Sequence, residues 1–394
     1  MLFLQYKGRI HRAKFTSRTI RYILSDQAAR LFPALQRRWL LPLESSPMTD
    51  VAREISSLSS AVIGSEAICA ELPEAFRKHS YFPPTPAQQT HRVYSIDDVV
   101  VTGWAGAMIK DGRLLTVLPR HNWVSSLRAR PHKMRELPSG RSYFNLMAST
   151  PARGHVFHRL FDSVLPLVSF LESGRAGNDL GLIVNAAESE IQARAVGFLK
   201  QRYGITAIEP LAEDEAVFVP HLETVVDTHG QPRGLQSPLG LALLDDIGRF
   251  IAGDASLEET PKRIYVSRND ARLRRVLNED AILPELEARG FKRVTLAGMP
   301  IARQVALFLN AEAVVGPHGA AFGHVSWCKP GTKIVEFIPG PDPSRKTTRP
   351  LANLDFWFIA LQRDLTYRCY LAGQVQRDDA FTIPRDLLIR ALDA

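Results

Sequence analysis

Strands and helices alternate along the chain after residue 150, and this alternation constrains the fold more than any other sequence feature. Apolar runs as short as a buried strand, such as 182–184 and 313–315, precede segments with helical periodicity, two of which close at Gly204 and Gly290. This alternation predicts parallel sheets covered by helices on both faces. Because a Gly- and Pro-rich loop near 228–238 interrupts it, we expect an α/β protein with two doubly wound, Rossmann-like lobes and a cleft between them.

The expected elements follow from this periodicity. Strands are expected at 182–184, 205–208, 216–219, 263–267, 293–296, 313–315 and 333–338. Helices are expected at 154–173, 188–203, 238–252, 278–289, 301–310 and 320–328. Nearer the N-terminus, Asp111-Gly112 lies between two apolar runs, which predicts a β-hairpin.

Three parts of the chain differ in composition. They are a basic accessory region with its linker (1–90), an N-terminal lobe that opens with the hairpin (91–235) and a C-terminal lobe that ends in a helix (236–394). The accessory region is expected to be helical near 18–40 and 48–78. It ends in Pro83-Pro84-Thr85-Pro86, which is typical of a stiff linker.

The formal net charge of +8 arises entirely in the first 40 residues, which hold nine Lys and Arg against one Asp. Residues 41–394 are formally neutral. This disfavours a nucleic-acid-binding protein, which should be basic over its main face. Apolar residues are interspersed with the basic ones, so residues 1–40 are suited to lie on an anionic membrane surface. A solvated arm is the alternative.

Cysteine content and hydropathy limit the compartment. Cys69, Cys328 and Cys369 are odd in number and far apart, which excludes a disulfide scaffold and does not match a zinc site. No apolar stretch reaches the ~18–20 residues of a membrane-spanning helix, and the first 30 residues lack the pattern of a secretory signal. We therefore expect a soluble protein in a reducing compartment, the cytoplasm. If residues 1–40 bind a membrane, the protein would be peripheral on the inner face of the plasma membrane.

One expected strand leads into the turn His318-Gly319-Ala320. Small residues there let a ligand approach the backbone, and the free N–H groups at a helix start favour an anion. His318 lies at the carboxyl end of its strand, where open α/β sheets bind ligands. The alternative is an ordinary tight turn with a packed histidine.

A second expected strand ends at Ser267-Arg268, and Arg272 follows four residues later. Arginine side chains bind phosphate oxygens in a bidentate way, so two of them can hold a diphosphate without a metal ion. For Arg268 the alternative is a surface salt bridge. Arg274 and Arg275 are expected on the solvated surface.

The helix expected at 154–173 carries one polar stripe on an otherwise apolar surface. At 100° per residue, His155, His158 and Asp162 fall within ~60° of one another. A carboxylate beside an imidazole can act as a general base, or can orient the imidazole that does. A hydrogen-bonded helix start is the alternative.

Several nucleotide-binding motifs are absent from the sequence. It contains no Asp-x-Asp pair for a divalent cation, no G-x-G-x-x-G and no P-loop. We therefore expect no metal ion and no cofactor, with arginines and helix N-termini neutralising phosphate.

Together these segments resemble glycosyltransferase family 61, over about residues 263–338. The matching pieces are Tyr265-Val-Ser-Arg268, Arg275-x-x-Asn278-Glu279, Gly290-Phe291, Gln304, Ala311, Val315-Gly-Pro-His318-Gly-Ala320, Pro330-Gly331 and Glu336. A weaker match is His158-x-x-x-Asp162. The family includes an EGF-domain O-linked N-acetylglucosamine transferase, plant xylan xylosyl- and arabinosyltransferases, and bacterial capsule enzymes.

The resemblance implies a GT-B fold, in which the C-terminal lobe holds the donor and the N-terminal lobe lies on the acceptor side. It also implies inverting, metal-independent transfer from a nucleotide sugar, which we expect to be a UDP-sugar. The donor-binding residues carried over are Arg268, Arg272, His318, Gly319, Ala320 and Glu336. For Glu336, which could accept from ribose hydroxyls, packing in the core is the alternative.

In-line displacement at the anomeric carbon needs a base on the acceptor hydroxyl. Asp162 is assigned as that base, and His158 is the runner-up. Asn278 is expected to cap a helix and Gln304 to make structural hydrogen bonds. Phe322-Gly323-His324 departs from the family pattern, which leaves the sugar open.

The expected setting is the bacterial capsule branch of this family, with a glycan or lipid-linked acceptor in cell-surface polysaccharide synthesis. Two alternatives stay open. One is an epimerase or hydrolase that acts on a nucleotide sugar with the same fold, and the other is a nucleotide-sugar-binding protein without transferase activity.

Overall fold

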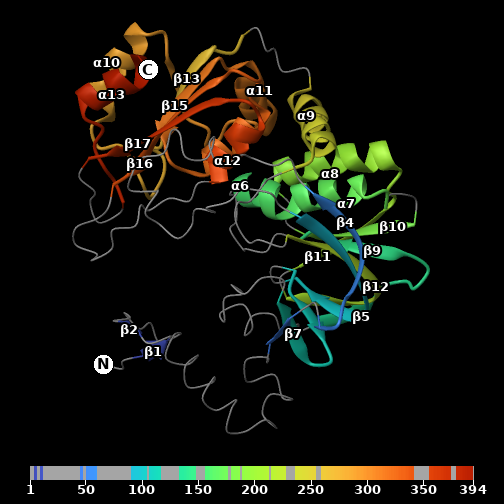
Figure 1. Ribbon diagram of the computed structural model, residues 1–394. Helices are drawn as coiled ribbons and strands as arrows, with labels where there is room; N and C mark the ends of the chain where they lie inside the picture. Colours follow the sequence, from blue (N-terminus) through green and yellow to red (C-terminus); the bar gives the residue numbers. More distant parts are fainter. Residues whose placement is uncertain are drawn as a thin grey trace.

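The computed structural model describes residues 4–6, 9–11, 45–47, 50–59, 90–103, 106–116, 133–147, 156–175, 179–186, 189–212, 214–227, 236–253, 259–340, 355–373 and 379–393. Within them the chain forms two large sheets with helices between and beside them (Figure 1). Two short strands, β1 (Leu4–Tyr6) and β2 (Arg9–His11), form a separate hairpin.

The first sheet is mixed. Its strands are β3 (Ser45–Pro47), β4 (Arg53–Ser59), β5 (Thr90–Thr102), β6 (Met108–Lys110), β7 (Arg113–Thr116), β8 (Lys133–Glu136), β9 (Ser142–Asn145), β10 (Leu180–Asn185), β11 (Ala207–Leu211) and β12 (Glu215–Asp227). The order is β11-β10-β9-β12-β5-β6-β7-β3, with β4 paired to β5 and β8 paired to β12. The strands from β11 to β12 pair in parallel. The pairs β12–β5, β5–β6 and β6–β7 are antiparallel, and β7 pairs with β3 in parallel.

The second sheet is entirely parallel over its described strands. These are β13 (Arg263–Val266), β14 (Lys292–Val294), β15 (Ala313–Pro317), β16 (Lys333–Pro339) and β17 (Thr366–Ala372), in the order β14-β13-β15-β16-β17. The chain passes from β13 to β14 on one side and returns to β15 on the other. The strand order therefore reverses between β13 and β15, which is where doubly wound sheets bind ligands.

Helices cover both faces of the second sheet and one face of the first. They are α6 (Val156–Arg159), the π-helical turn η2 (Leu160–Val164), α7 (Leu165–Glu172), α8 (Glu190–Tyr203), α9 (Pro238–Ala252), α10 (Glu279–Ala288), α11 (Ile301–Asn310), the 3-10 helix η3 (Ala320–Trp327), α12 (Asp355–Gln362) and α13 (Arg385–Asp393). In Figure 1, α10 and α13 lie on the outer face of the second sheet, and the other helices lie between the two sheets.

One hydrophobic core joins the two sheets. It includes Leu182 of β10, Leu244 of α9 and Val314 of β15, all nearly inaccessible to solvent. A second cluster lies on the other face of the first sheet, and a third lies beneath α10 and α13. Because the central core draws on both lobes, its burial stabilises their mutual arrangement as well as each sheet.

Local sequence signals account for several elements. Asp111 and Gly112 adopt φ of 51° and 74° between β6 and β7, which confirms the predicted hairpin. Helix α8 is preceded by the N-cap residue Ser189, whose hydroxyl accepts from the Gln192 N–H. It ends at Gly204 with φ of 67°, a conformation in which glycine has no steric penalty.

Two expectations are wrong. Arg53–Ser59 is a strand, although the sequence predicts a helix over 48–78; its serines are poor helix formers, and the long strand β5 offers it a partner. The first sheet is mixed rather than parallel, because β5 pairs with β12 more than 110 residues away. The expected helix near 18–40, the 83–86 linker and the 228–235 loop lie outside the described residues.

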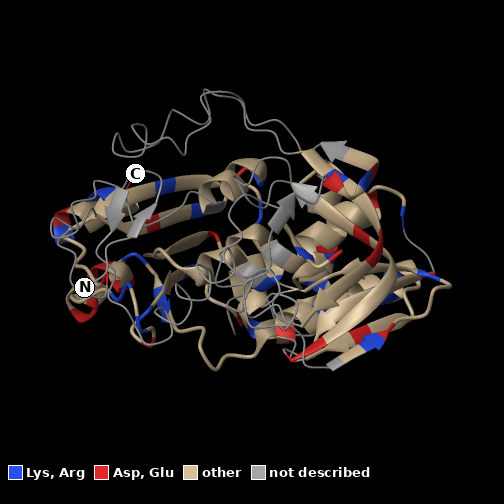
Figure 2. Cartoon of the chain, turned by 90° about the horizontal axis from the view of Figure 1, so that it is seen from below, with Lys and Arg blue, Asp and Glu red and all other residues tan. Residues whose placement is uncertain are grey.

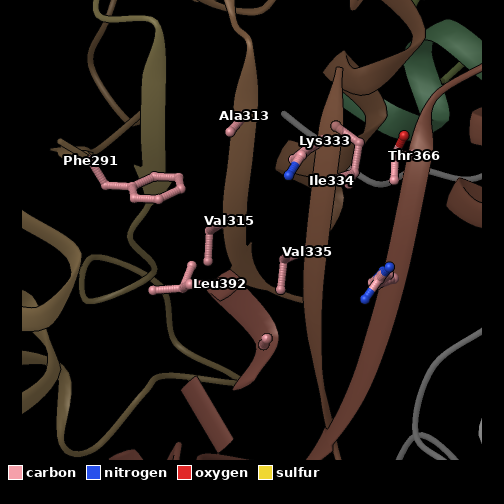
Figure 3. Close-up of a pocket in the computed structure, with 10 residues that line it drawn as sticks. Phe291, Ala313, Val315, Lys333, Ile334, Val335, Thr366 and Leu392 are labelled. Carbon is pink, nitrogen blue, oxygen red and sulfur yellow. The ribbon is translucent and has the colours of Figure 1, made fainter. Parts of the chain in front are cut away.

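A small pocket lies against the outer face of the second sheet, beside Phe291, Val315, Lys333 and Leu392 (Figure 3). Its volume of about 30 Å³ is close to that of one water molecule and far below the ~300 Å³ of a small-molecule site. It abuts the amino ends of β15 and β16, at the edge of the sheet away from the strand ends that carry the predicted site.

The charges of the described chain are mixed. Lys, Arg, Asp and Glu are interspersed over both lobes in Figure 2, in keeping with the formal neutrality of residues 41–394. Among the helices that the structure describes, none combines the length and the apolar character needed to cross a membrane.

Candidate active site

Two of the predicted motifs meet at the carboxyl edge of the second sheet. Arg268 follows β13 and the turn His318-Gly319 follows β15, and these two strands are neighbours in register. They flank the point where the strand order reverses. The topology therefore brings Arg268 and His318 to the position at which this kind of sheet leaves a ligand-binding crevice.

The side chain of Arg268 lies directly on Gly319. A Cβ added to Gly319 would overlap Arg268 Nη1 and come within 2.7 Å of Cζ. The backbone of Gly319 is extended, with φ of 174°, so this position requires glycine for space rather than for conformation. Any side chain here would displace the guanidinium.

Arg268 is held in place but keeps much of its binding capacity. Nη2 donates to the Leu273 carbonyl oxygen at 3.2 Å, while the buried Nε has no partner among the described residues. Burial, and to a lesser degree the nearby charge of Arg274, lowers the pKa of Arg268 to about 10. A desolvated cation with unused donors is well suited to bind an anion.

Arg274, and not Arg272, is the second cation beside Arg268. Burial also lowers the pKa of Arg274, whereas Arg272 is exposed. Neither Arg268 nor Arg274 forms an ion pair with a carboxylate of the described residues. The expectation of a solvated Arg274 is therefore wrong. Its backbone has φ of 59°, and no sequence pattern marks that turn.

The end of β13 is anchored by a buried carboxylate. Glu279, at the start of α10, accepts from the Ser267 hydroxyl at 2.8 Å and from the Tyr265 hydroxyl at 3.1 Å. Burial raises the pKa of Tyr265, so its phenol remains a donor. This triad fixes the backbone immediately before Arg268.

Asn278 precedes α10 as predicted but does not cap it. Its side chain accepts from the Ile383 N–H at 2.9 Å and donates to the Ile383 carbonyl at 2.8 Å, and it makes no hydrogen bond to the helix. The expected capping bond is therefore wrong, because a backbone segment distant in sequence satisfies the amide.

His318 is buried against a carboxylate. Its Nδ1 lies 2.5 Å from Glu336 Oε1, and the hydroxyl of Tyr367 donates to Glu336 Oε2. Glu336 is fully inaccessible to solvent, and both of its oxygens are used by these partners. The alternative role for Glu336, a group packed in the core, is the one that matches its position. The backbone N–H of His318 also donates to the Phe337 carbonyl at 2.8 Å.

Helix α6, which carries His158, packs directly on η3. The Cα of Phe157 would lie 3.3 Å from a Cβ added to Gly323, so glycine allows this close approach. The ring of Phe356 lies 5.4 Å from Phe157 and 5.3 Å from His318, and it links the helix to the turn. The helix that carries His158 therefore packs beside the segment that follows His318-Gly319, although the two are far apart in the sequence.

The helix expected at 154–173 is present from Val156 to Glu172 but is not regular. Pro166 has no N–H to donate to the carbonyl four residues earlier, at Asp162, and the chain forms the π-helical turn η2 there. The expected polar stripe is based on the 100° per residue of a regular α-helix. His158 lies in α6 and Asp162 in η2, but their side chains and residue His155 lie outside the described part.

Gln304 makes structural hydrogen bonds, which confirms the prediction. Its Nε2 donates to the carbonyls of Leu296 and Met299, and its Oε1 lies 3.1 Å from His324 Nε2. His324 is fully buried and stacks on Phe308, with the ring centroids 5.0 Å apart. Since Gln304 Oε1 can only accept, His324 carries its proton on Nε2.

His324 is expected to make the protein less stable in acid. Burial lowers the pKa of His324 to about 3, so the folded protein keeps it neutral while the unfolded chain protonates it near pH 6.5. Its contribution to stability is complete above pH 6.5 and is lost as the pH falls towards 3. Lowering the pH from 7 to 5 should cost the wild type about 2 kcal/mol of unfolding free energy through His324, and His324→Gln should lack this part of the decrease. Urea denaturation at both pH values measures it.

His221→Gln, on the surface of the first sheet, is the control. It keeps His324, so it should keep the decrease in unfolding free energy that His324 causes between pH 7 and 5. Equal pH slopes for the wild type and His324→Gln would contradict the prediction.

No cluster of three or more His, Cys, Asp or Glu side chains suited to a metal ion occurs among the described residues. The expectation of a metal-free site stays a prediction, since the side chain of Asp162 lies outside the described part.

Comparison with known proteins finds a family model and a relative that this chain resembles. The model of a family described as Glycosyltransferase 61 matches residues 127–335, which is more than half of the chain. The EGF domain-specific O-linked N-acetylglucosamine transferase of Drosophila melanogaster is 34% identical over 83 residues, or 20% of this chain. The matched segment is 16% of that relative, so the chain aligns with only about a sixth of its length.

Proposed function

The chain belongs to glycosyltransferase family 61, and from this membership we propose that it transfers a sugar from a nucleotide-sugar donor to an acceptor hydroxyl. The observation that carries the proposal is the pair of desolvated guanidiniums, Arg268 and Arg274, beside the His318-Gly319 turn at the reversal of the strand order. The diphosphate of a nucleotide sugar is the kind of anion that such a site binds.

The donor would lie with its diphosphate against Arg268 and the backbone of Gly319 and Ala320. Arg274 would replace the predicted Arg272 as the second cation, because it is the one whose charge acts on Arg268. Arg272 is exposed at the rim of the same loop and would meet only the outer part of a bound donor.

The reaction would be an in-line displacement. The acceptor oxygen attacks the anomeric carbon and loses its proton to Asp162, with His158 as the second candidate base. The bond from the anomeric carbon to the diphosphate breaks, and the departing oxygen keeps the electron pair, next to Arg268 and Arg274. Positioned cations and a base are the contributions that this chemistry needs from a protein.

The remaining assignments follow from the resemblance. They are a GT-B arrangement of the two lobes, inversion at the anomeric carbon, a UDP-sugar donor, no metal requirement, and a glycan or lipid-linked acceptor in cell-surface polysaccharide synthesis. A mixed first sheet and a parallel second sheet joined by helices are compatible with a two-lobed transferase.

A donor screen tests the proposal. The purified chain is titrated with UDP-, GDP-, CMP- and dTDP-sugars, with and without EDTA, while thermal stabilisation and slow donor hydrolysis are measured. A ligand that binds only the folded state raises stability by RT ln(1 + [L]/Kd), so a donor should be detected without an acceptor. Stabilisation by one nucleotide class that survives EDTA is expected, and silence across the panel would overturn the proposal.

Replacing Asp162 by alanine should abolish transfer and leave donor affinity within about twofold of the wild type, because the base acts only in the transition state. The loss in kcat should be about 100-fold or more. Asp280→Ala, an exposed aspartate on α10, serves as the matched control and should retain full activity. A weakened donor affinity in Asp162→Ala would instead assign Asp162 to the donor site.

Deleting residues 1–40 should release the protein from membranes. The segment contributes the whole formal charge of +8, and each cation near an anionic surface contributes about 1 kcal/mol. Sedimentation with vesicles of phosphatidylglycerol and phosphatidylcholine should fall to background, while donor-induced stabilisation of the remaining chain is unchanged. Undiminished vesicle binding would contradict the proposed membrane contact.

A further inference from the structure

Glu336 is a buried carboxylate that needs compensation for its charge. It lies on β16 and is inaccessible to solvent, and its two contacts are Tyr367 on one oxygen and His318 on the other. A hydroxyl supplies one hydrogen bond but no charge. Because an ionised carboxylate is costly to bury unless it is paired, the ring in contact with it is the natural counter-charge.

His318 is fixed so that one nitrogen remains for a ligand. The backbone of His318 is tied to β16 by the bond to the Phe337 carbonyl, and the ring packs 5.3 Å from that of Phe356. Nδ1 is taken by Glu336, so only Nε2 is left to bind. The next residue, Gly319, is the one covered by the guanidinium of Arg268.

We propose that Glu336 is a positioning residue that keeps His318 as an imidazolium, whose Nε2–H donates to a phosphate oxygen of the departing diphosphate. The inference rests on the proposed function. It adds a third cation to the two arginines and gives Glu336 a role other than contact with the donor. The hydrogen bond strengthens as negative charge builds on the leaving group, so it favours the transition state over the bound donor.

The charges around the pair allow this arrangement. The groups nearest to His318 are Glu336, with Tyr367 behind it, and Arg268, which lies on Gly319. The charges of Arg274 and Asp270 act on Arg268, and those of Asp379 and Glu336 act on Arg274. The arginines oppose a further positive charge on the ring, and Glu336 in direct contact offsets them. No proton needs to leave His318 in the step, because a charge-assisted hydrogen bond is sufficient.

Glu336→Gln tests the role, since it keeps the shape and removes the charge. We expect kcat to fall about 10- to 100-fold, with KM for the donor changed less than about threefold. The alkaline limb of the kcat profile should move to lower pH, because the imidazolium loses its counter-ion. An unmoved alkaline limb would overturn the inference.

Glu279→Gln is the matched control. Glu279 is also a buried carboxylate that accepts from a tyrosine hydroxyl in the same sheet, but it does not contact His318. Its rate is expected to fall as well, because Glu279 anchors the backbone before Arg268, but its alkaline limb should coincide with that of the wild type. A limb shifted equally in both variants would show a general effect of removing a buried charge and would overturn the proposal.

Two further measurements separate this inference from the proposed function and from misfolding. Selective ¹³C labelling of histidine, with His318 assigned by the signal missing in His318→Asn, reports ring protonation in the full chain without donor. The midpoint of the His318 titration should move to lower pH in Glu336→Gln. If the midpoint falls as expected but the wild type turns over no donor, the proposed function fails while the pairing of His318 with Glu336 stands. If it does not move, the pairing fails whatever the activity.

Should Glu336→Gln fail to fold, Tyr367→Phe provides the second variant. It removes the hydroxyl that donates to Glu336 and keeps the ring in the core. The carboxylate then interacts more strongly with His318, so the alkaline limb should move to higher pH. A shift to lower pH would overturn the inference.

Discussion

Replacing Gly319 by alanine should weaken binding of the nucleotide diphosphate about 10- to 100-fold while the protein remains folded. The added Cβ would overlap Arg268 Nη1, and the guanidinium is the end of a flexible side chain, so it moves and the backbone does not. The extended φ of 174° suits alanine as well as glycine. The loss corresponds to the hydrogen bonds of one charged donor, about 1.5–3 kcal/mol. Isothermal titration with UDP, or with the nucleotide identified by the screen, measures it.

Two variants control this prediction. Arg268→Gln should lose affinity by a similar factor, because it removes the group that Gly319→Ala displaces. Gly197→Ala, in α8, should leave affinity and stability unchanged or slightly improved, since the new Cβ would contact nothing beyond the backbone of its own helix and alanine favours a helix. Wild-type affinity in Gly319→Ala would place the diphosphate away from Arg268.

Replacing Trp327 by alanine should lower the unfolding free energy by about 3–5 kcal/mol. Trp327 ends η3, is 1% exposed and donates through Nε1 to the Leu244 carbonyl of α9 at 3.2 Å. A Cβ on Gly248 would overlap the indole, so the ring lies directly on the α9 backbone. Because this core contains residues of both sheets, both lobes should lose stability together in one transition, followed by far-UV circular dichroism in urea.

Phe250→Ala is the matched control on the same helix. Phe250 is 40% exposed and touches Phe198 of α8 at the surface, with ring centroids 5.3 Å apart, so its loss should cost about 1 kcal/mol. Two separate transitions in Trp327→Ala would show that the lobes unfold independently, contrary to the shared core.

The variants at Gly319, Asp162 and Trp327 are expected to affect different properties of the protein. Gly319 and Arg268 are proposed to act on donor binding and Asp162 on the acceptor hydroxyl, whereas Trp327 supports the helices between the sheets. Each should change one measured quantity and leave the others nearly intact. A variant that lowers all of them together would point to loss of structure rather than loss of a function.

Much of the second lobe can be predicted from the sequence alone. The apolar runs, the helix periodicity and the closing glycines are local signals, and they place β13, β15, β16 and α9–α11 close to their observed bounds. Parallel strands end at the same edge of a sheet, so the positions of Arg268 and His318 at that edge follow from the strand pattern. Helix α12 and strand β17 are not among the predicted elements. In α12 the six residues between Asp355 and Gln362, FWFIAL, are all apolar, so the segment has no helical stripe.

Which distant segments meet is a property of the tertiary structure. The pairing of β5 with β12, the packing of α6 on η3 and the turn that brings Arg274, rather than Arg272, to Arg268 all join residues far apart or depend on a backbone conformation without a sequence signature. Residue types and local periodicity determine which segments form helices and strands, but these elements could pack together through several different surfaces. Burial selects among these surfaces, since the buried area, and with it the free energy, depends on which faces pack together.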